Sequence, residues 1–285
     1  MALYDPVDGV YRKVKKSYDP VEGTHRKVIK AYDDVEGVYR QYFSSDPTAG
    51  GLAVGDSIWL NVRNTLSEFL VVHQGNPDSN LYDESCNGTW LLMKDILMRG
   101  SFDLDTYDAW GEVLLQKKSN NYRDAKILHA LETEFMDRLS SNVQSIIKQV
   151  KIPYAYHDSD SDEYKVASGA NGVSTKIFLL SGIEVGGYGI DQLEYRTDGA
   201  TLDYFRGTDN QRRIAKFNSS NEFWWLRSAM TKLDTDYDIY PYVWVVMNDG
   251  SIKYHHCTAN DGMRPAFIID RDTPIDQSTG KNIIE

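Results

Sequence analysis

Short stretches of alternating or continuous apolar residues follow one another from residue 57 towards the end of the chain. Alternation is typical of β-strands, because successive side chains of a strand point to opposite faces of the sheet. A turn is expected where Gly250 follows Asn248 and Asp249. We expect strands at Ser57–Val62, Phe69–His73, Thr89–Met93, Lys176–Leu180, Phe223–Ser228, Tyr242–Met247 and Pro265–Ile269.

Two stretches between these strands have the three-to-four-residue spacing of amphipathic helices. The first is expected to begin at Asp124 as N-cap and to bury Leu128, Leu131, Phe135 and Leu139. The second is expected to end before Pro153 and to bury Val143, Ile146, Ile147 and Val150. Two scaffold helices packed on short antiparallel strands predict the fold class α+β.

A repeat opens the chain. Its three copies begin at Tyr4, Tyr18 and Tyr32, so they are 14 residues apart, and the first reads YDPVDGVYRKVKKS. Each copy has an acidic residue before a glycine, at Gly9, Gly23 and Gly37, followed by alternating residues. This pattern predicts strand, turn, strand in every copy. Units this small bury little surface alone, so we expect an attachment or assembly arm; the alternative is an extension packed on its own domain.

Composition suggests where the parts of the chain meet. The sequence DPTAGGLA, residues 46–53, is typical of a linker. We therefore expect an arm of three β-repeats over residues 1–45, a linker over 46–53, a main domain over 54–272 and a C-terminal tail over 273–285.

Charge and hydrophobicity narrow the class of protein. The net charge of −11 disfavours a nucleic-acid partner, because phosphate binding needs a basic face. The N-terminus MALYDPVDG has no apolar signal segment, and no apolar run approaches the roughly 18 residues that span a bilayer. We expect no signal peptide, no membrane insertion and synthesis in the bacterial cytoplasm, so that a role outside the cell needs a carrier. Whether Cys86 and Cys257 pair stays open.

A series of longer motifs resembles a bacterial and phage domain family of unassigned function. In chain order they are FLVVHQGNP, CNGTWLLMKDI, IKQVKIPY, KIFLLSGIEVGGYG, FWWLRSA and GMRPAFII, between about Val54 and Asp270. The arm resembles the N-terminal repeats that accompany this domain in phage structural proteins. The pattern that closes the domain is a Trp-rich strand, a variable-looking loop region and then Gly-x-Arg-Pro. It is similar to proteins of the C-type-lectin fold, among them the variable proteins of diversity-generating retroelements.

The resemblance implies a C-type-lectin-like domain that holds a ligand surface steady. It also implies a virion protein of the phage tail, with other tail proteins as partners of the repeats and a homotrimer as its oligomer. The Glu-Pro-Asn motif of calcium-dependent sugar binding is missing, so calcium-dependent sugar recognition is not expected.

Motifs of catalysis or metal binding are not recognised in the sequence. There is no H-E-x-x-H, G-x-S-x-G or Walker-type loop, and we expect no catalytic residue, metal or cofactor. His255, His256 and Cys257 are adjacent, so on a strand they point to alternate faces and do not chelate one ion. Two acidic runs lack the glycine and distal glutamate of an EF-hand. They are Asp158, Asp160, Asp162 and Asp234, Asp236, Asp238.

Other conspicuous residues are expected to be structural. The glycines of GGYG, residues 186–189, are interpreted as a turn, because this stretch lacks the lysine and the strand-to-helix setting of a phosphate loop. Trp224, Trp225, Leu226 and Arg227 are expected in the core, and Arg264 as a partner of a carboxylate or of backbone carbonyls.

The stretch between Ser228 and Gly262 is rich in groups suited to recognition. Along its strand, Tyr242, Trp244 and Val246 share one face, while Val243 and Val245 share the other. The valines suit the core, and the aromatic face can then meet a host cell-surface protein or glycan. The predicted ligand-binding residues are Lys232, Asp234, Asp236, Tyr237, Asp238, Tyr240, Tyr242, Trp244, Asn248, Lys253, Tyr254, His255, His256, Asn260 and Asp261.

We therefore expect a receptor-binding or adhesion protein of a phage tail, not an enzyme. Three alternatives stay open: a loop-rich edge of the fold without a ligand, a cell-wall glycan hydrolase with two loop carboxylates, and a purely structural virion component.

This hypothesis predicts that replacing Tyr242 and Trp244 with Ala abolishes cell binding and leaves thermal unfolding largely unchanged. Binding to cells and the melting temperature are the two measurements, and a parallel loss of both would contradict it.

Overall fold

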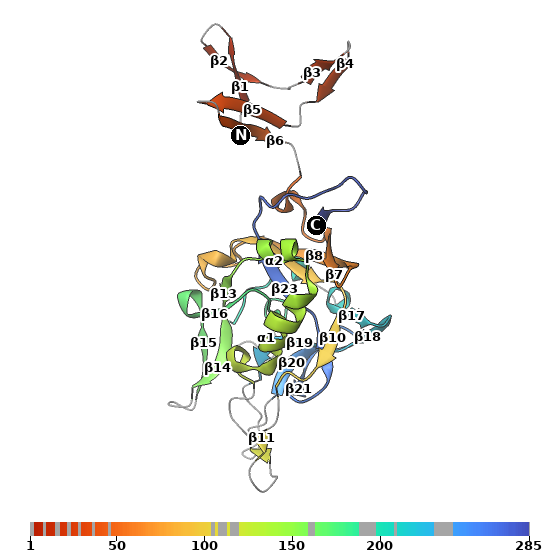
Figure 1. Cartoon of the computed structure of the whole chain (residues 1–285). Helices are drawn as coiled ribbons and strands as arrows, with labels where there is room; N and C mark the ends of the chain where they lie inside the picture. The colour runs from red at the N-terminus through yellow and green to blue at the C-terminus, as the bar shows by residue number, and fades with distance from the viewer. Residues whose placement is uncertain are drawn as a thin grey trace. The chain divides into compact units, whose positions relative to one another are not determined.

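The protein consists of two compact units, Met1–Pro47 and Thr48–Glu285. The computed structural model describes residues 3–7, 10–14, 18–21, 24–27, 30–35, 38–44, 47–103, 106–107, 113–114, 120–158, 163–187, 198–207, 210–230 and 242–284, and every statement below concerns these residues. Figure 1 shows the chain with its elements labelled.

The first unit consists of three β-hairpins, one for each sequence repeat. Each repeat forms two paired strands where strands were predicted, while the predicted turns at Gly9, Gly23 and Gly37 lie outside the described residues. Equivalent positions pair in each hairpin: Asp5 with Arg12, Asp19 with Arg26, and Asp33 with Arg40. The hairpins are β1 (Leu3–Val7) with β2 (Val10–Val14), β3 (Tyr18–Val21) with β4 (Thr24–Lys27), and β5 (Lys30–Val35) with β6 (Val38–Ser44).

One five-stranded sheet of the second unit contains the most continuous apolar strands. All six residues of its strand β9, between β23 and β8, are buried, which is why that stretch is largely apolar in sequence. β7 alternates between buried and more open positions, as its sequence predicts. The strand order is β23 (Ala266–Ile269), β9 (Gly88–Met93), β8 (Thr65–Gly75), β7 (Ser57–Val62) and β24 (Ile283–Ile284).

A second five-stranded sheet carries the region that the sequence assigns to binding. Its central strand β19 is buried along its whole length, so Trp224, Trp225, Leu226 and Arg227 belong to the core as predicted. The strand order is β10 (Met98–Gly100), β22 (Asp261–Met263), β19 (Trp224–Ala229), β20 (Tyr242–Val246) and β21 (Ile252–His256).

Four two-stranded antiparallel ribbons accompany these sheets. They are β11 (Thr106–Tyr107) with β12 (Val113–Leu114), β13 (Val150–Ile152) with β16 (Val173–Thr175), β14 (Tyr154–Asp158) with β15 (Glu163–Ala167), and β17 (Ala215–Phe217) with β18 (Ser220–Glu222).

The helices are much shorter than expected, and the prediction of an α+β, C-type-lectin-like fold with two scaffold helices is wrong. α1 (Lys126–Ala130) passes into a π-helical turn, Leu131–Phe135, and then a 3-10 turn, Met136–Arg138. α2 (Ser141–Ile146) begins at its N-cap Ser140, whose Oγ accepts from the Val143 N–H. Both helices follow one another along the same side of the second unit (Figure 1). The described part of the chain is a β-rich fold.

The predicted helix boundaries differ from the observed ones at both helices. Asp124 closes a separate 3-10 turn, Tyr122–Asp124, and Ala125 occupies the position before α1. Val150, expected on the second helix, starts β13 and pairs with Thr175. A distant strand partner therefore outweighs the helical spacing of Val150 with Ile146 and Ile147.

The stretch Lys176–Leu180 is buried as predicted but does not form a strand. Phe178 makes a single two-way bridge to Ala266 of β23, with N···O distances of 2.8 and 2.9 Å. The Leu180 carbonyl accepts from the backbone N–H of Arg227 on β19. The stretch thus connects the two five-stranded sheets, because each bonds to it at a different residue.

Arg227 and Glu184 form a fully buried ion pair where these segments meet. Arg227 Nη1 and Nη2 each lie 2.6 Å from a different carboxylate oxygen of Glu184, and neither side chain has exposed surface. The remaining donors of Arg227 reach the carbonyls of Pro153, Leu179 and Asp198 at 2.8 to 2.9 Å. All five N–H groups of the guanidinium are therefore satisfied.

Glu184 is equally well held. It accepts from the Tyr82 hydroxyl at 2.6 Å and from the Ser181 backbone N–H at 2.9 Å. Burial and the neighbouring carboxylate raise the pKa of Tyr82. Burial alone would lower the pKa of Arg227, but the charge and hydrogen bonds of Glu184 outweigh it and raise that pKa. A Cβ on Gly199 would collide with Ser181 Oγ, so a residue with a side chain does not fit at this position beside the Arg227–Glu184 pair.

Arg264 is the second buried arginine, and its predicted structural role is confirmed. Its Nε donates to the Met93 carbonyl at 2.8 Å, and its guanidinium lies 4.9 Å from the Trp224 ring centroid. Burial lowers the pKa of Arg264 to about 10.

Both ends of the second unit are held to the rest of that unit by backbone hydrogen bonds or strand pairing. Ala49, within the stretch expected to be a linker, is fully buried and donates to the Thr273 carbonyl at 2.9 Å. Ile283 and Ile284, within the expected tail, pair in parallel with Trp59 and Leu60 of β7. No helix among the described residues is long and apolar enough to cross a membrane.

We predict that Glu184→Gln lowers the free energy of unfolding by about 3–5 kcal/mol, because it leaves the Arg227 charge buried without a counter-charge. Urea unfolding followed by tryptophan fluorescence reports on the second unit, which holds all six tryptophans. Glu222→Gln is the matched control: its carboxylate is partly exposed and 4.0 Å from Arg99, so we expect a loss below about 1 kcal/mol. Similar losses in the two variants would contradict the prediction.

Candidate functional site

The β20–β21 hairpin carries most of the described residues that the sequence assigns to ligand binding. Its turn is the predicted one: Gly250 has a φ of +80° and donates to the Met247 carbonyl, while Asp249 Oδ1 accepts from Ser251 N–H. β21 pairs with β20 alone and ends the strand order of its sheet. Side chains of this hairpin therefore lie at a sheet edge.

An aromatic group occupies one face of the hairpin. Tyr242 is opposite His256 and Trp244 is opposite Tyr254, and directly opposed residues share a face of the sheet. The Tyr254 ring centroid lies 5.3 Å from that of Tyr242 and 5.9 Å from that of Trp244, both nearly perpendicular to it. The Tyr242 and His256 centroids are 5.7 Å apart. We call Tyr242, Tyr254 and His256 the Tyr254 surface.

The side chains of the hairpin differ in how much of their surface is exposed. Val243 and Val245 are fully buried, which confirms that the valine face lies in the core. Tyr254 is 39% exposed and Tyr242 is partly exposed. Trp244 is only 3% exposed, so the expectation that it faces solvent is wrong. The reason is its cross-strand neighbour, because the Tyr254 ring packs edge-on against the indole.

Two other predicted binding residues of the hairpin, Asn248 and Lys253, lie apart from this group. Asn248 is exposed at the turn, at the far end of β20 from Tyr242; a strand rises about 3.4 Å per residue, so the two are well separated. Lys253 is exposed on the opposite face from Tyr254. The remaining members, Lys232, Asp234, Asp236, Tyr237, Asp238 and Tyr240, lie outside the described residues, as do Asp160 and Asp162.

His255 and Asp261 form a polar pair next to the hairpin. His255 Nδ1 lies 2.8 Å from Asp261 Oδ2, with Asp261 on β22 only 5% exposed. Burial raises the pKa of Asp261, against the opposing effect of the His255 hydrogen bond. Phe223 packs edge-on against the imidazole, at 5.1 Å between centroids. The aspartate and the phenyl ring fix the orientation of a partly exposed imidazole, which then offers its other nitrogen to a ligand.

Asn260, the neighbour of Asp261, is exposed and is held through its backbone. Its carbonyl accepts from Nε and Nη2 of Arg99 on β10, at 3.0 and 2.6 Å. Arg99 is thus a positioning residue of this loop that the sequence analysis did not identify, because its partner is 161 residues away.

A second histidine–aspartate pair, His73 with Asp203, was also missed from the sequence. His73 Nδ1 lies 2.9 Å from Asp203 Oδ2, and the histidine is almost completely buried. Burial lowers the pKa of His73 from its ordinary value of 6.5, more than the Asp203 carboxylate raises it. The two residues are far apart in sequence and neither belongs to a recognisable motif, so no local signal identifies them.

Neither the cysteines nor the adjacent histidines form a metal cluster in the described part of the chain. Cys86 and Cys257 are both buried and form no disulfide with each other, which answers the open question of their pairing. His255 and His256 lie opposite Val243 and Tyr242, so they do point to different faces, and His256 Nδ1 bonds to Thr258 Oγ1 at 2.7 Å. No group of three or more His, Cys, Asp or Glu side chains that could hold a metal occurs among the described residues.

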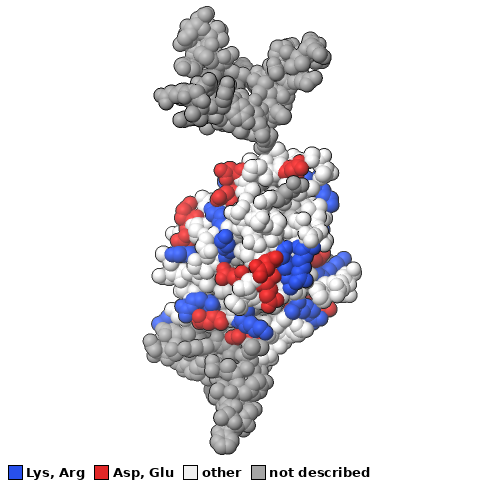
Figure 2. All heavy atoms as spheres, viewed as in Figure 1, with Lys and Arg blue, Asp and Glu red and all other residues white. Residues whose placement is uncertain are grey.

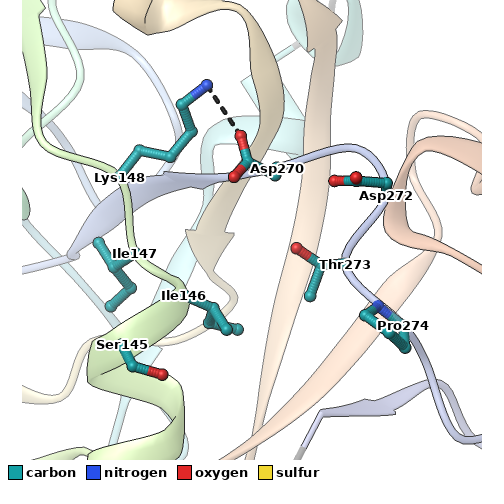
Figure 3. A pocket seen from close by; sticks show the side chains of 8 residues that line it. All are labelled: Ser145, Ile146, Ile147, Lys148, Asp270, Asp272, Thr273 and Pro274. Carbon is teal, nitrogen blue, oxygen red and sulfur yellow. Dashed lines mark ion pairs between the residues drawn. The ribbon is translucent and has the colours of Figure 1, made fainter. Parts of the chain in front are cut away.

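Two hollows of the described surface lie away from the hairpin. The larger, about 380 Å³, is bounded by the end of α2 and the chain after β23. The Lys148–Asp270 ion pair, at 3.0 Å, lies along its margin (Figure 3). The smaller, about 240 Å³, lies beside the β7–β8 turn. On the face of the molecule seen in Figure 2, basic and acidic side chains are interspersed.

The His73 pair predicts a pH dependence of stability. The folded protein favours neutral His73, so this imidazole takes up its proton at a higher pH in the unfolded chain than in the folded protein. The free energy of unfolding therefore falls as the pH drops below about 6.5. One proton accounts for at most about 1.4 kcal/mol per pH unit. Melting temperatures of His73→Gln between pH 8 and 5 should fall less steeply than those of the unmodified protein. The exposed His129→Gln should not change the slope, and an unchanged slope in His73→Gln would contradict the assignment.

Comparison with known proteins gives one match. No curated protein and no solved structure matches the chain. The family model described as Domain of unknown function (DUF6273) matches residues 87–271, which hold both five-stranded sheets except β7, β8 and β24, together with the Arg227–Glu184 pair and the Tyr254 surface. The chain belongs to this family of domains of unknown function.

Proposed function

We propose that this chain is a binding protein that recognises a protein or glycan of a host cell surface through the Tyr254 surface, as a receptor-binding component of a phage tail. In this role it works without a cofactor and without catalysis. The family assignment names no activity, so the proposal rests on the geometry of the β20–β21 hairpin and on the repeats.

The observation that carries the proposal is the exposure of Tyr254 on an edge strand. Among the described residues the large hydrophobic side chains classed as exposed are Leu66 and Tyr254. Unlike an isolated surface residue, Tyr254 is held by perpendicular contacts with Tyr242 and the buried Trp244. A tyrosine fixed before binding loses little conformational entropy in a complex, which is why such residues contribute much of the energy of recognition surfaces.

The chemistry around Tyr254 suits a ligand with both flat apolar and polar groups. The rings of Tyr242, Tyr254 and His256 offer apolar faces, which pack against sugar C–H groups or side chains of a protein. The hydroxyls and the imidazole at the same place supply hydrogen bonds. His256 is held in place by the contact of its Nδ1 with Thr258 Oγ1 at 2.7 Å.

The hairpins of the first unit suit attachment to other tail proteins. Three hairpins share one register, with aspartate opposite arginine at the same position each time. Isolated two-stranded hairpins are marginally stable in water and need neighbours to bury their faces. In the proposed role, neighbouring copies of this chain, as in a homotrimer, or other proteins of the virion supply them.

Tyr254→Ala should reduce binding to host cells by at least about tenfold, because one buried aromatic contact contributes 2 kcal/mol or more in such interfaces. Binding of the labelled full chain to a panel of bacterial strains and to their isolated cell-wall glycans measures this. The melting temperature should change little, because Tyr254 is well exposed.

Two variants make the test specific. Leu66→Ala removes a side chain of equal exposure, 40%, from β8 and should leave binding unchanged. Trp244→Ala should lower the melting temperature and binding together, since large-to-small changes at buried aromatic positions cost about 3–5 kcal/mol. Binding by Tyr254→Ala at the level of the unmodified chain would refute the proposal.

A further inference from the structure

The smaller hollow, beside the turn that joins β7 to β8, has an unusual set of charged residues. It holds about 240 Å³ and is lined by Asn61, Arg63, Asn64, Asp137, Arg138, Leu139 and Ser140. Two arginines and two carboxamides therefore face one small space together with a single carboxylate. The site is remote in sequence from the Tyr254 surface and independent of it.

The backbone holds this hollow in a defined shape. Arg63 and Asn64 have φ angles of +49° and +60°, the left-handed region that suits a two-residue hairpin turn but rarely takes arginine. The Arg63 N–H donates to the Arg138 carbonyl at 2.7 Å, and Val62 bridges Leu139. The turn is thus fixed to the end of the helical stretch before α2. Both arginines are brought to the same place although they are far apart in sequence.

Neither arginine of the hollow has an ion-pair partner. In the part of the chain that the structure describes, no carboxylate pairs with Arg63 or Arg138. Arg138 Nε is shielded from solvent and has no hydrogen-bond acceptor. Burial and the nearby Arg63 charge lower the pKa of Arg138 more than the opposing charge of Glu134 raises it. Two like charges are therefore held side by side in a protein whose net charge is −11.

Hydrogen-bond donors complete the lining. The carboxamides of Asn61 and Asn64 bond to no other described residue, and both residues are exposed. Each offers an NH₂ group, and the guanidinium groups offer planar pairs of N–H donors that match the oxygens of a phosphate or carboxylate. The size of the hollow suits a compact group. Asp137 is the one feature that opposes an anion.

We propose that this hollow is a binding site for a compact oxyanion, a phosphate or carboxylate group, held by Arg63 and Arg138 with Asn61 and Asn64 as additional donors. The anion supplies the negative charge that the two guanidinium groups lack. Asp137 at the same hollow weakens the binding and so sets its affinity.

The test is calorimetric titration of the full chain with inorganic phosphate at pH 7.5, with chloride keeping the ionic strength constant; acetate in a parallel titration separates phosphate from carboxylate preference. We expect saturable binding by at least one of the two anions. Arg138→Gln and Arg63→Gln should each weaken it by about tenfold, because each removes one charge-assisted pair of hydrogen bonds. Asp137→Asn should tighten it by about threefold, because it removes a repulsive charge.

Controls separate a site from general charge effects. Arg123→Gln makes the same change at an exposed arginine that pairs with Asp124, and it should leave binding unchanged. In chloride alone, Arg138→Gln should melt at or above the temperature of the unmodified protein, because a like-charge contact is relieved. Absence of saturation with both anions, equal weakening in Arg123→Gln, or weaker binding in Asp137→Asn would each overturn the proposal.

Discussion

The buried ion pair of Arg227 and Glu184 is the constraint on which the second unit depends. Arg227 lies on β19, and the five N–H donors of its guanidinium reach Pro153 before β14, Leu179, the Glu184 carboxylate and the chain at Asp198. Burying two charges costs several kcal/mol each, so such a pair is tolerated only when its hydrogen bonds are complete. All of these hydrogen bonds can form only when every participating segment has its native position. The pair therefore couples segments that are far apart in the sequence.

The motifs that stand out in the sequence belong largely to this constraint. SGIE supplies Ser181 and Glu184, and LRS supplies Arg227 and Ser228, whose hydroxyl donates to Asp198 at 2.6 Å. Arg264 of GMRP is also buried, and its guanidinium packs against Trp224. A set of charged and polar residues in a fixed order can resemble a catalytic constellation in sequence. Here its members are buried and serve the packing of the core, so their spacing reflects folding, whereas Tyr254 is exposed at the edge of the sheet.

Local patterns predicted local structure well. The alternation of Ser57–Val62 and the turn at Asn248, Asp249 and Gly250 need only near neighbours, and so do the three hairpins of the repeats. Prediction failed where a distant partner decided the outcome. Val150 leaves a helical pattern to pair with Thr175, and Phe178 makes one bridge instead of a strand, because the two sheets approach it from different sides. Of the predicted binding face, the alternation correctly placed Val243 and Val245 inside but could not reveal that Tyr254 covers Trp244. The His73–Asp203 pair and the two arginines beside the β7–β8 turn gave no local signal at all.

The buried thiols have a practical consequence for a protein proposed to meet the outside of a cell. Burial raises the pKa of Cys86 to about 12, so at pH 7 only about one molecule in 10⁵ carries the reactive thiolate there. Cys257 is likewise enclosed. Oxidants and thiol reagents therefore find no ready target on the folded second unit. A cysteine introduced at an exposed position would accept a dye or a cross-linker selectively, and its reaction with reagent would report directly on which faces are covered when a partner is bound.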